Sequence, residues 1–158
     1  MAKKQQKGAA DGIKIIARNR KALHDYKIAD RIEAGIALLG TEVKSLREGK
    51  CQLADSYAAI RGGEVFLINC HISHYKNAGK YGQHEPTRKR KLLLKRGEIN
   101  RLERRVEQKG ATLIPLSVYF KKGIAKVELA VCEGKRQYDK REAIKQRDLQ
   151  REERTREK

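Results

Sequence analysis

Alternating apolar residues mark the first strand expected in this chain. Ile32, Ala34, Ile36 and Leu38 recur at every second position, which is the spacing of a strand that buries one face. Gly40 interrupts the pattern, and glycine is common where a strand gives way to a turn. We therefore expect a strand that ends close to residue 40.

A short helix is expected immediately afterwards, over residues 41–48. Thr41 is a suitable N-cap, and Gly49 lies just past the expected end. Val43 and Leu46 are three positions apart and share one face, which could close the end of a small β structure. An extended pattern then resumes, so a strand, a plugging helix and a return strand indicate the start of a closed barrel.

The clearest hairpin in the sequence turns at Gly62 and Gly63. Both residues adopt positive φ without steric cost, and β-rich runs flank them at 52–60 and 65–70. The second run has apolar residues on both faces. We expect it to be buried on both sides for part of its length.

The second half of the chain predicts one helix and a further pair of strands. Residues 96–109 place Ile99, Leu102 and Val106 on one helical face, and Gly110 is a natural stop. Strands are expected next, at 112–120 and 124–132 around a turn at 121–123, with Pro115 at an edge or a bulge.

These elements favour a mainly β fold, a β-barrel with flanking α-helices. About five or six short strands and two helices without a βαβ rhythm fit a small antiparallel barrel or an α+β fold. The oligonucleotide-binding (OB-like) barrel is a natural candidate. We expect three regions: a flexible basic arm at 1–17, the barrel domain at 18–133, and a basic tail at 134–158 with too few apolar residues for a packed stripe. The tail should be disordered when free and helical when bound.

Charge changes this picture from a small barrel to a polyanion-binding protein. The chain carries a formal net charge of +18 over 158 residues. Basic residues outnumber acidic ones eight to two in residues 1–27, twelve to four in 76–109 and ten to six in 134–158. Three separate basic segments suggest extended contact with phosphates, so nucleic acid is the favoured partner. An anionic membrane surface is the competing interpretation.

The first of these segments contains a short motif beside the expected barrel. Asn19 could cap a helical turn, after which Arg20 and Lys21 could reach phosphates and His24 could stack on a base. The same residues would equally serve as the solvated start of a helix. The residue types alone do not separate the two interpretations.

A long basic loop is expected at residues 73–91. Tyrosines and histidines lie among its lysines and arginines, a mixture suited to unpaired RNA. Arg88, Arg90 and Lys91 at its end are candidate RNA contacts. An apolar anchor that includes Leu93 follows directly.

No catalytic constellation is visible, so the chain is not expected to be an enzyme. Cys51, Cys70 and Cys132 fall in strand-like patterns, where each is expected to be a small buried hydrophobe. No phosphate-binding loop or nucleophile motif is present, and no metal or cofactor is expected. The odd cysteine count favours a reducing cytoplasm, and no apolar run is long enough to cross a bilayer. We expect a cytoplasmic monomer without a membrane partner.

The chain closely resembles the small protein B family, the tmRNA-binding proteins of bacterial ribosome rescue. The matching segments are residues 19–26, 33–35 (EAG), 40–47 (GTEVKSLR), 55–57 (DSY), 84–94 and 134–141. Each segment alone is weak, and together they are highly specific. A general RNA-binding or ribosome-associated structural protein without tmRNA specificity is the alternative.

The resemblance implies where such a protein would bind RNA. It implies an OB-type barrel that binds the tRNA-like domain of tmRNA through the positions matching Asn19, His24, Glu33, Leu93 and Lys126. Elongation factor Tu with GTP and alanyl-tRNA synthetase would act on the same RNA.

The resemblance also gives the tail a role in the decoding centre of the small ribosomal subunit, beside its rRNA, and in the empty mRNA channel. The tail positions are Gly134, Lys135, Arg136, Tyr138, Asp139, Lys140, Arg141 and Ile144. Tyr138 stands where the family often has a histidine. It keeps an aromatic stacking face without a titratable nitrogen.

Overall fold

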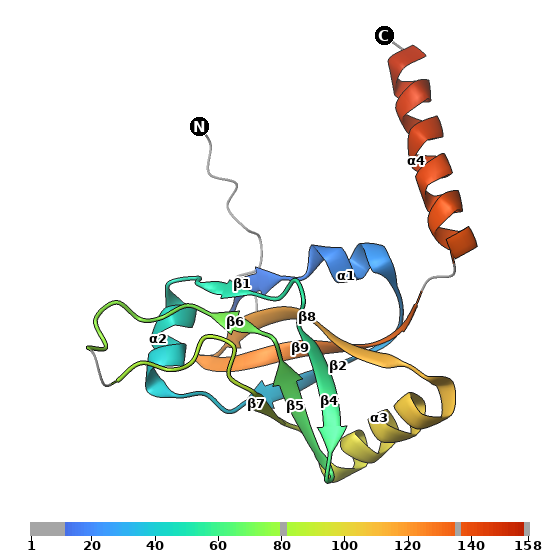
Figure 1. Ribbon diagram of the computed structural model, residues 1–158. Helices are drawn as coiled ribbons and strands as arrows, with labels where there is room; N and C mark the ends of the chain where they lie inside the picture. The colour runs from blue at the N-terminus through green and yellow to red at the C-terminus, as the bar shows by residue number, and fades with distance from the viewer. Residues whose placement is uncertain (1–11, 80–81, 135–136, 157–158) are drawn as a thin grey trace.

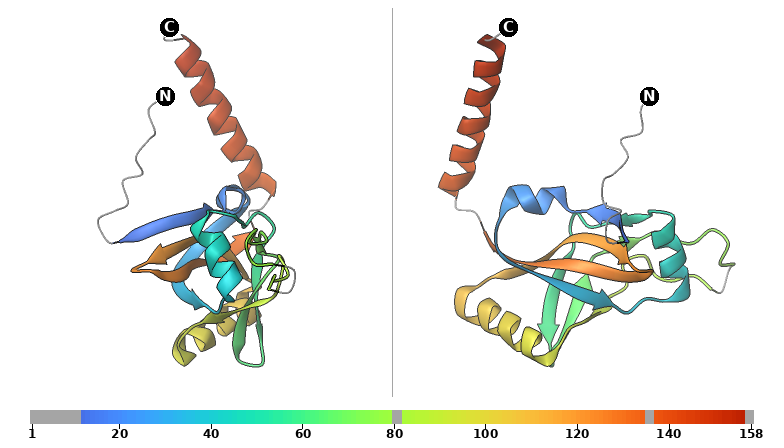
Figure 2. Two further views of the ribbon diagram at one scale, coloured as in Figure 1. Left: turned by 90° about the vertical axis from the view of Figure 1, so that its left-hand side faces the viewer. Right: turned by 180° about the vertical axis from the view of Figure 1, so that it is seen from behind.

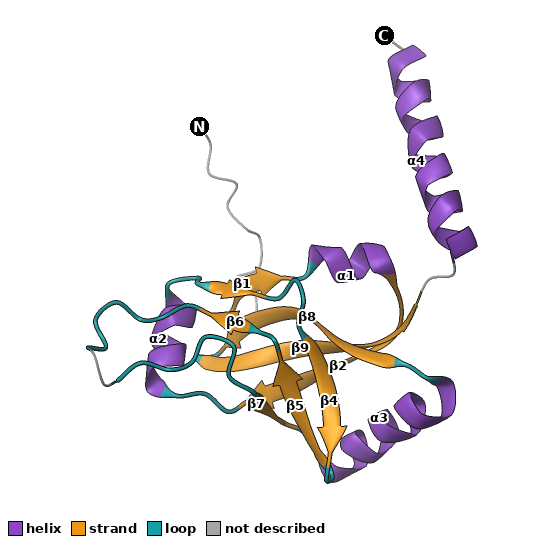
Figure 3. Cartoon of the chain, viewed as in Figure 1, coloured by secondary structure: helices purple, strands orange, loops and turns teal. Residues whose placement is uncertain are grey.

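The computed structural model of the chain describes residues 12–79, 82–134 and 137–156. Within these ranges it contains nine strands and four helices (Figures 1 and 3). They are β1 (Ile13–Arg18), α1 (Arg20–Asp25), β2 (Tyr26–Ile36), α2 (Gly40–Arg47), β3 (Cys51–Gln52), β4 (Tyr57–Arg61), β5 (Glu64–Ile68), β6 (His71–Ile72), β7 (Arg90–Leu93), α3 (Arg96–Lys109), β8 (Thr112–Lys121), β9 (Ile124–Gly134) and α4 (Gln137–Arg156).

Six of the strands close into an antiparallel barrel. Their order is β8-β4-β5-β7-β2-β9, and β9 pairs back onto β8. Strand β1 pairs with residues 117–121 of β8. Strands β3 and β6 form a separate two-stranded sheet. Because every pairing is antiparallel and the helices flank the barrel, the predicted mainly β fold class is confirmed.

Alternate residues of the barrel strands fill its interior. Val65, Leu67, Val127 and Leu129 have no exposed surface, as expected for side chains on the inner face of a closed sheet. Helix α2 lies at one end of the barrel and buries Leu46 completely (Figure 1). This is the plugging role that the sequence predicts for that helix.

Three features that the sequence predicts at glycine and proline positions are present in the structure. The β4–β5 turn contains Gly62 and Gly63, both with positive φ. Helix α3 spans the predicted residues and ends at Gly110 in the left-handed conformation. The register shift in β8 falls between Pro115 and Ser117, so of the predicted edge or bulge at Pro115 the structure has the bulge.

Three boundaries differ from the sequence-based expectation. Strand β1 occupies residues 13–18, most of which were assigned to the flexible arm, because a partner strand in β8 completes its hydrogen bonds. Strand β7 lies where only a loop end and an apolar anchor were expected. Helix α2 begins one residue earlier, with Leu39 as its N-cap. Thr41 is therefore not the N-cap: its hydroxyl bonds to His84, and the Glu42 carboxylate accepts a hydrogen bond from the Leu39 N–H (3.1 Å).

The tail forms helix α4, which projects away from the barrel (Figures 1 and 2). Residues 144–156 are exposed throughout, so this helix has no buried stripe there. The structure is helical where the sequence predicts disorder in the free protein, and the state in solution stays a prediction. None of the helices in the described ranges is long and apolar enough to cross a membrane.

Candidate nucleic-acid interface

The outer face of four adjacent strands carries the most distinctive surface of the barrel. Gly35 of β2 pairs with Leu93 of β7 on one side and with Lys126 of β9 on the other, and Lys126 pairs with Tyr119 of β8. Directly paired residues point to the same face of a sheet. These four residues therefore form one row across the barrel, which we call the barrel face together with Glu33.

Because Gly35 has no side chain, the Leu93 side chain can lie over its backbone in this row. A Cβ atom at Gly35 would meet the Cβ of Leu93 at 3.1 Å, closer than ordinary contact. Leu93 is 53% exposed, an unusual position for a leucine in a strand. The missing side chain at residue 35 thus leaves an open apolar surface that could pack against a base or a ribose.

Glu33 lies next to this row and is part of a polar network. The Tyr119 hydroxyl donates a hydrogen bond to its carboxylate, and the Lys121 ammonium lies 3.7 Å away. Burial raises the pKa of Tyr119, and the Glu33 carboxylate raises it further, so the hydroxyl remains a donor. With a side chain 39% exposed, Glu33 can also accept hydrogen bonds from base amino or ribose hydroxyl groups.

A second polar pair borders Glu33. Arg31 contacts the Glu128 carboxylate at 3.2 Å, and Ser117 donates to the same carboxylate at 3.2 Å. Tyr119, Lys121 and this pair are functional candidates that the sequence did not predict. In β8 the available signal was that Ser117, Tyr119 and Lys121 alternate with the apolar Val118 and Phe120, which puts the three on one face of the strand.

Helix α1 covers the other end of the same outer face. Its Ala22 is buried against Ile114, Leu116, Ala130 and Cys132. This packing fixes the helix beside the open barrel face. A surface pocket of about 360 Å³ lies between α1 and residues 54–57.

The basic residues of α1 point to solvent. Arg20, Lys21 and His24 are all exposed, as a phosphate-contacting or stacking role requires. Lys21 makes an exposed ion pair with Asp55 at 3.3 Å, and His24 contacts Asp25 at 2.9 Å. Exposed pairs of this kind contribute little to stability, so both side chains can exchange their partners for RNA.

Asn19 does not belong to an exposed interface, contrary to the sequence-based assignment. Its Oδ1 caps α1 by accepting from the Ala22 N–H at 3.1 Å, which confirms the predicted cap. Its Nδ2 donates to the carbonyls of Leu53 and Pro115, both at 3.1 Å. The side chain is buried and already engaged, so Asn19 positions α1 rather than contacting RNA.

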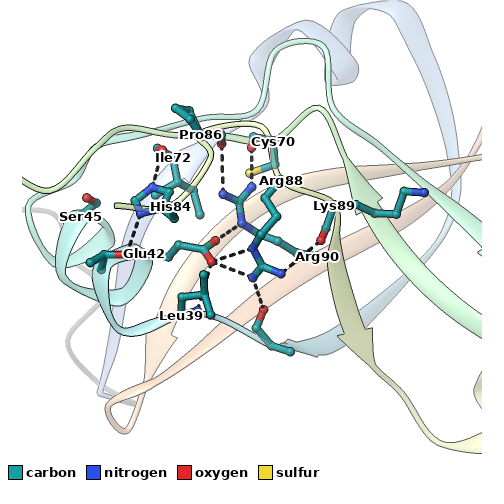
Figure 4. Close-up of polar contacts among 12 residues, drawn as sticks. Leu39, Glu42, Ser45, Cys70, Ile72, His84, Pro86, Arg88, Lys89 and Arg90 are labelled. Atoms are coloured by element: carbon teal, nitrogen blue, oxygen red, sulfur yellow. Dashed lines mark hydrogen bonds and ion pairs between the residues drawn. The ribbon is translucent and has the colours of Figure 1, made fainter. Parts of the chain in front are cut away.

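Arg90 is likewise a structural residue, so its assignment as an RNA contact is wrong. It is fully buried and bonds to the equally buried Glu42 carboxylate, to the Cys70 carbonyl (2.6 Å) and to the Pro86 carbonyl (3.1 Å) (Figure 4). A buried arginine is retained when its charge is paired. The sequence could not distinguish it from exposed neighbours in a run of basic residues.

The Glu42 carboxylate, at the start of α2, forms ion pairs with two arginines. Arg88 adds a second ion pair at 2.7 Å and keeps about a third of its side chain exposed. Burial raises the pKa of Glu42, but the hydrogen bonds from Arg90 and Arg88 outweigh it and hold this pKa below its usual value. Arg88 is therefore mainly an anchor with a partly exposed edge.

The long loop before β7 is fixed to α2 by a buried histidine. His84 is only 3% exposed and bridges the Thr41 hydroxyl (2.8 Å) and the Ile72 carbonyl (2.9 Å) (Figure 4). The Ser45 hydroxyl donates to the Ser73 carbonyl at 2.7 Å. Of the loop histidines that the sequence suggests for contact with unpaired RNA, His84 is unsuitable, because its ring is inside the protein.

The remaining barrel assignments are on the surface. Lys91 is exposed on the same side of β7 as Leu93 and pairs with Glu64 at 2.9 Å. Lys126 is half-buried in the centre of the barrel face. The structure thus brings Glu33, Lys91, Leu93 and Lys126 together, with the basic side of α1 at the margin.

Comparison with known proteins places this surface in a family. The SmpB protein family model matches residues 16–158. The chain belongs to the SmpB protein family. Similar curated SmpB relatives carry the name SsrA-binding protein. One from Sulfurihydrogenibium sp. is 57% identical over 139 residues, 88% of this chain and 91% of the relative. Another from Desulfitobacterium hafniense is 54% identical over 144 residues, 91% and 92% of the two chains.

A solved structure supports the same placement. It is described as "tmRNA-SmpB: a journey to the center of the bacterial ribosome" and is 50% identical to this chain, with a TM-score of 0.65. The match covers 81% of this chain and 93% of that one. The SmpB relatives are named as binding proteins, which confirms the expectation that this chain is not an enzyme.

Most tail assignments fall where little is described. Lys135 and Arg136 lie outside the described residues, as do the side chains of Tyr138, Asp139, Lys140 and Arg141, and Gly134 is described only as the end of β9. Ile144 is described and is 49% exposed on α4. Their roles therefore remain proposals.

Proposed function

We propose that this chain is a non-catalytic adaptor that binds the tRNA-like domain of tmRNA and delivers it to stalled ribosomes. The barrel face carries the proposal, because it combines an exposed leucine, a lysine and a networked carboxylate beside the basic α1. Charged groups alone would bind any RNA, whereas this mixture can recognise shape and base edges. The relatives named as SsrA-binding proteins and the tmRNA-SmpB structure give the specific RNA.

In this proposal each exposed group has a separate task. Lys126 and Lys91 contact phosphates, Leu93 packs against an unstacked nucleoside, and Glu33 accepts hydrogen bonds from the RNA. Arg20, Lys21 and His24 extend the contact along α1. Elongation factor Tu with GTP and alanyl-tRNA synthetase act on the same RNA, and the whole process takes place in the cytoplasm.

The proposed role of α4 is on the ribosome. The tail occupies the decoding centre and the empty mRNA channel, with Tyr138 and Asp139 near its start. A helix without a packed stripe is marginal alone, so its ordering cost is met only on the vacant channel. In the free protein, amides 144–156 should show little protection from hydrogen exchange. Strong protection there would contradict the disorder-to-helix part of the proposal.

The barrel-face proposal is tested by a titration at low and high salt. We expect the protein to prefer the tRNA-like domain of tmRNA over an elongator tRNA, and the preference to survive high salt. Lys126→Ala should weaken binding to the tmRNA fragment about five- to tenfold. Lys109→Ala removes the same charge from the exposed end of α3 and should change binding less than twofold.

Equal affinity for both RNAs that collapses together with salt would overturn the proposal. The chain would then be a general cationic RNA-binding protein. Truncation after Gly134 provides the second arm, because it should leave fragment binding largely intact and abolish peptide tagging on stalled ribosomes. Unchanged tagging with Tyr138→Ala and Asp139→Ala would contradict the decoding-centre assignment.

A further inference from the structure

Two cysteine sulfurs face each other, and neither cysteine is among the residues proposed to contact RNA. The Sγ atoms of Cys51 and Cys70 are 3.7 Å apart, and both thiols are free. Cys51 begins β3, Cys70 immediately precedes β6, and the β3–β6 pairing holds both backbones in place. Cys132 belongs to the separate cluster beneath α1 and is fully buried.

The pair is accessible from one side. Cys51 is half-buried and lines a surface pocket of about 380 Å³ together with Arg18, Arg20 and Leu53. Cys70 is only 1% exposed. A small molecule in the pocket can therefore reach the Cys51 side of the pair, while Cys70 is protected from larger reagents.

The two thiols affect each other's pKa, and the pKa of Cys70 is lowered overall although burial and the Glu42 charge oppose this. The hydrogen bond from Cys51 lowers the pKa of Cys70 despite burial, and the positive charge of Arg90 lowers it further. The same hydrogen bond raises the pKa of Cys51. The Arg90 guanidinium is held at this place by its hydrogen bond to the Cys70 carbonyl. A thiolate is the form that reacts with oxidants.

We propose that Cys51 and Cys70 form a reversible disulfide-forming site for small peroxides. The two thiols together lose two protons and two electrons and form one S–S bond. The O–O bond of hydrogen peroxide breaks, and the peroxide is reduced to two water molecules. A dithiol reductant reverses the reaction by thiol–disulfide exchange.

The cross-link would reinforce a segment that supports the RNA surface. It joins the β3 segment to the β5–β6 connection, and Leu53, two residues after Cys51, accepts the hydrogen bond from Asn19. Because a cross-link restricts the unfolded chain, the oxidised protein should be more stable than the reduced one.

The test uses the full-length protein treated with hydrogen peroxide and then with dithiothreitol. Titratable thiols should fall from three to one, and peptide mapping should find Cys51 linked to Cys70. The thermal midpoint should rise by about 5–10 °C on oxidation and return on reduction. Cys132→Ala is the matched control, because it should keep the cross-link, whereas Cys51→Ala should lose it.

Three outcomes would overturn the proposal. The first is that all three thiols persist in peroxide while the protein stays folded. The second is a cross-link that involves Cys132 or joins two chains. The third is a Cys51–Cys70 cross-link that lowers the thermal midpoint, since it would show that the folded barrel does not accommodate the bond. The mapping on the unmodified sequence remains decisive even where a cysteine variant fails to fold.

Discussion

At the scale of single residues, two charged side chains are buried and a large apolar side chain is exposed, the reverse of the usual arrangement. Glu42 and Arg90 are inside the protein, whereas Leu93 is on its surface. The first pair ties α2 to β7, and the exposed leucine gives the barrel face its apolar centre. Each arrangement makes a distinct prediction, one about stability and one about RNA binding.

Glu42→Gln should destabilise the fold strongly. The substitution keeps the side-chain shape but leaves the buried Arg90 charge unpaired, which costs about 3–5 kcal/mol. Urea unfolding at neutral pH measures the loss. Glu48→Gln is the matched control, since its ion pair with Lys50 is on the surface and should contribute at most about 1 kcal/mol.

The Glu42 carboxylate should also make the stability of the fold depend on pH. Because the folded pKa of Glu42 lies below the usual value of 4.5, its contribution is fully present above that pH. It is lost as the pH falls through the lower folded pKa. Between pH 7 and pH 3 the free energy of unfolding should therefore fall more steeply with pH for the unmodified chain than for Glu42→Gln. Parallel curves for the two proteins would contradict this assignment.

Gly35→Ala should weaken RNA binding without unfolding the barrel. The new Cβ would lie 3.1 Å from the Leu93 Cβ, so Leu93 must shift from its flat position. We expect affinity for the tmRNA fragment to fall about tenfold while the far-ultraviolet circular dichroism spectrum is retained. Unchanged affinity would show that the leucine surface is not part of the interface.

At the scale of elements, local signals explain much of the structure. Helix α3 follows its apolar spacing and stops at Gly110, and the β4–β5 turn follows its two glycines. These features depend on neighbours in sequence, and the sequence contains them.

Strands and ion pairs whose partners lie far away in the sequence were harder to predict from it. Strand β1 is a strand because β8 completes it, and β7 is one because β2 and β5 lie on either side. Likewise, nothing in the basic run 88–91 marks Arg90 as buried, because its partner Glu42 is 48 positions away. The candidate site was predictable at Lys126 and Leu93 only through the family resemblance.

Glycine substitutions at the two ends of α3 should have opposite effects on stability. Gly97→Ala lies in the first turn with no atom within 4 Å of its added Cβ, so stability should rise by about 0.5 kcal/mol. Gly110→Ala forces a side chain into the left-handed C-cap and should cost about 1 kcal/mol. Thermal unfolding of both variants in one buffer measures the pair. A loss at residue 97 would show that the helix start is not as open as described.

At the scale of the whole molecule, the barrel and the tail are separable. The described residues after β9, 137–156, form only helix α4, whereas β9 pairs with both β2 and β8 and buries residues of both apolar clusters. A chain that ends at Gly134 should keep the cooperative unfolding of the full-length protein, within about 0.5 kcal/mol. A chain that ends at Gly123 lacks β9 and should show no cooperative transition in a thermal scan. Cooperative unfolding of the shorter chain would contradict the closure role of β9.

This topology also determines when the protein can fold during its own synthesis. Strand β2 is made early, but its partner β9 is the last strand to leave the ribosome. Until then the edges of β2 and β8 stay unpaired, which is the condition that favours aggregation and proteolysis. A copy made from a broken message is therefore left as an open sheet, so this protein would itself need the rescue pathway in which we place it.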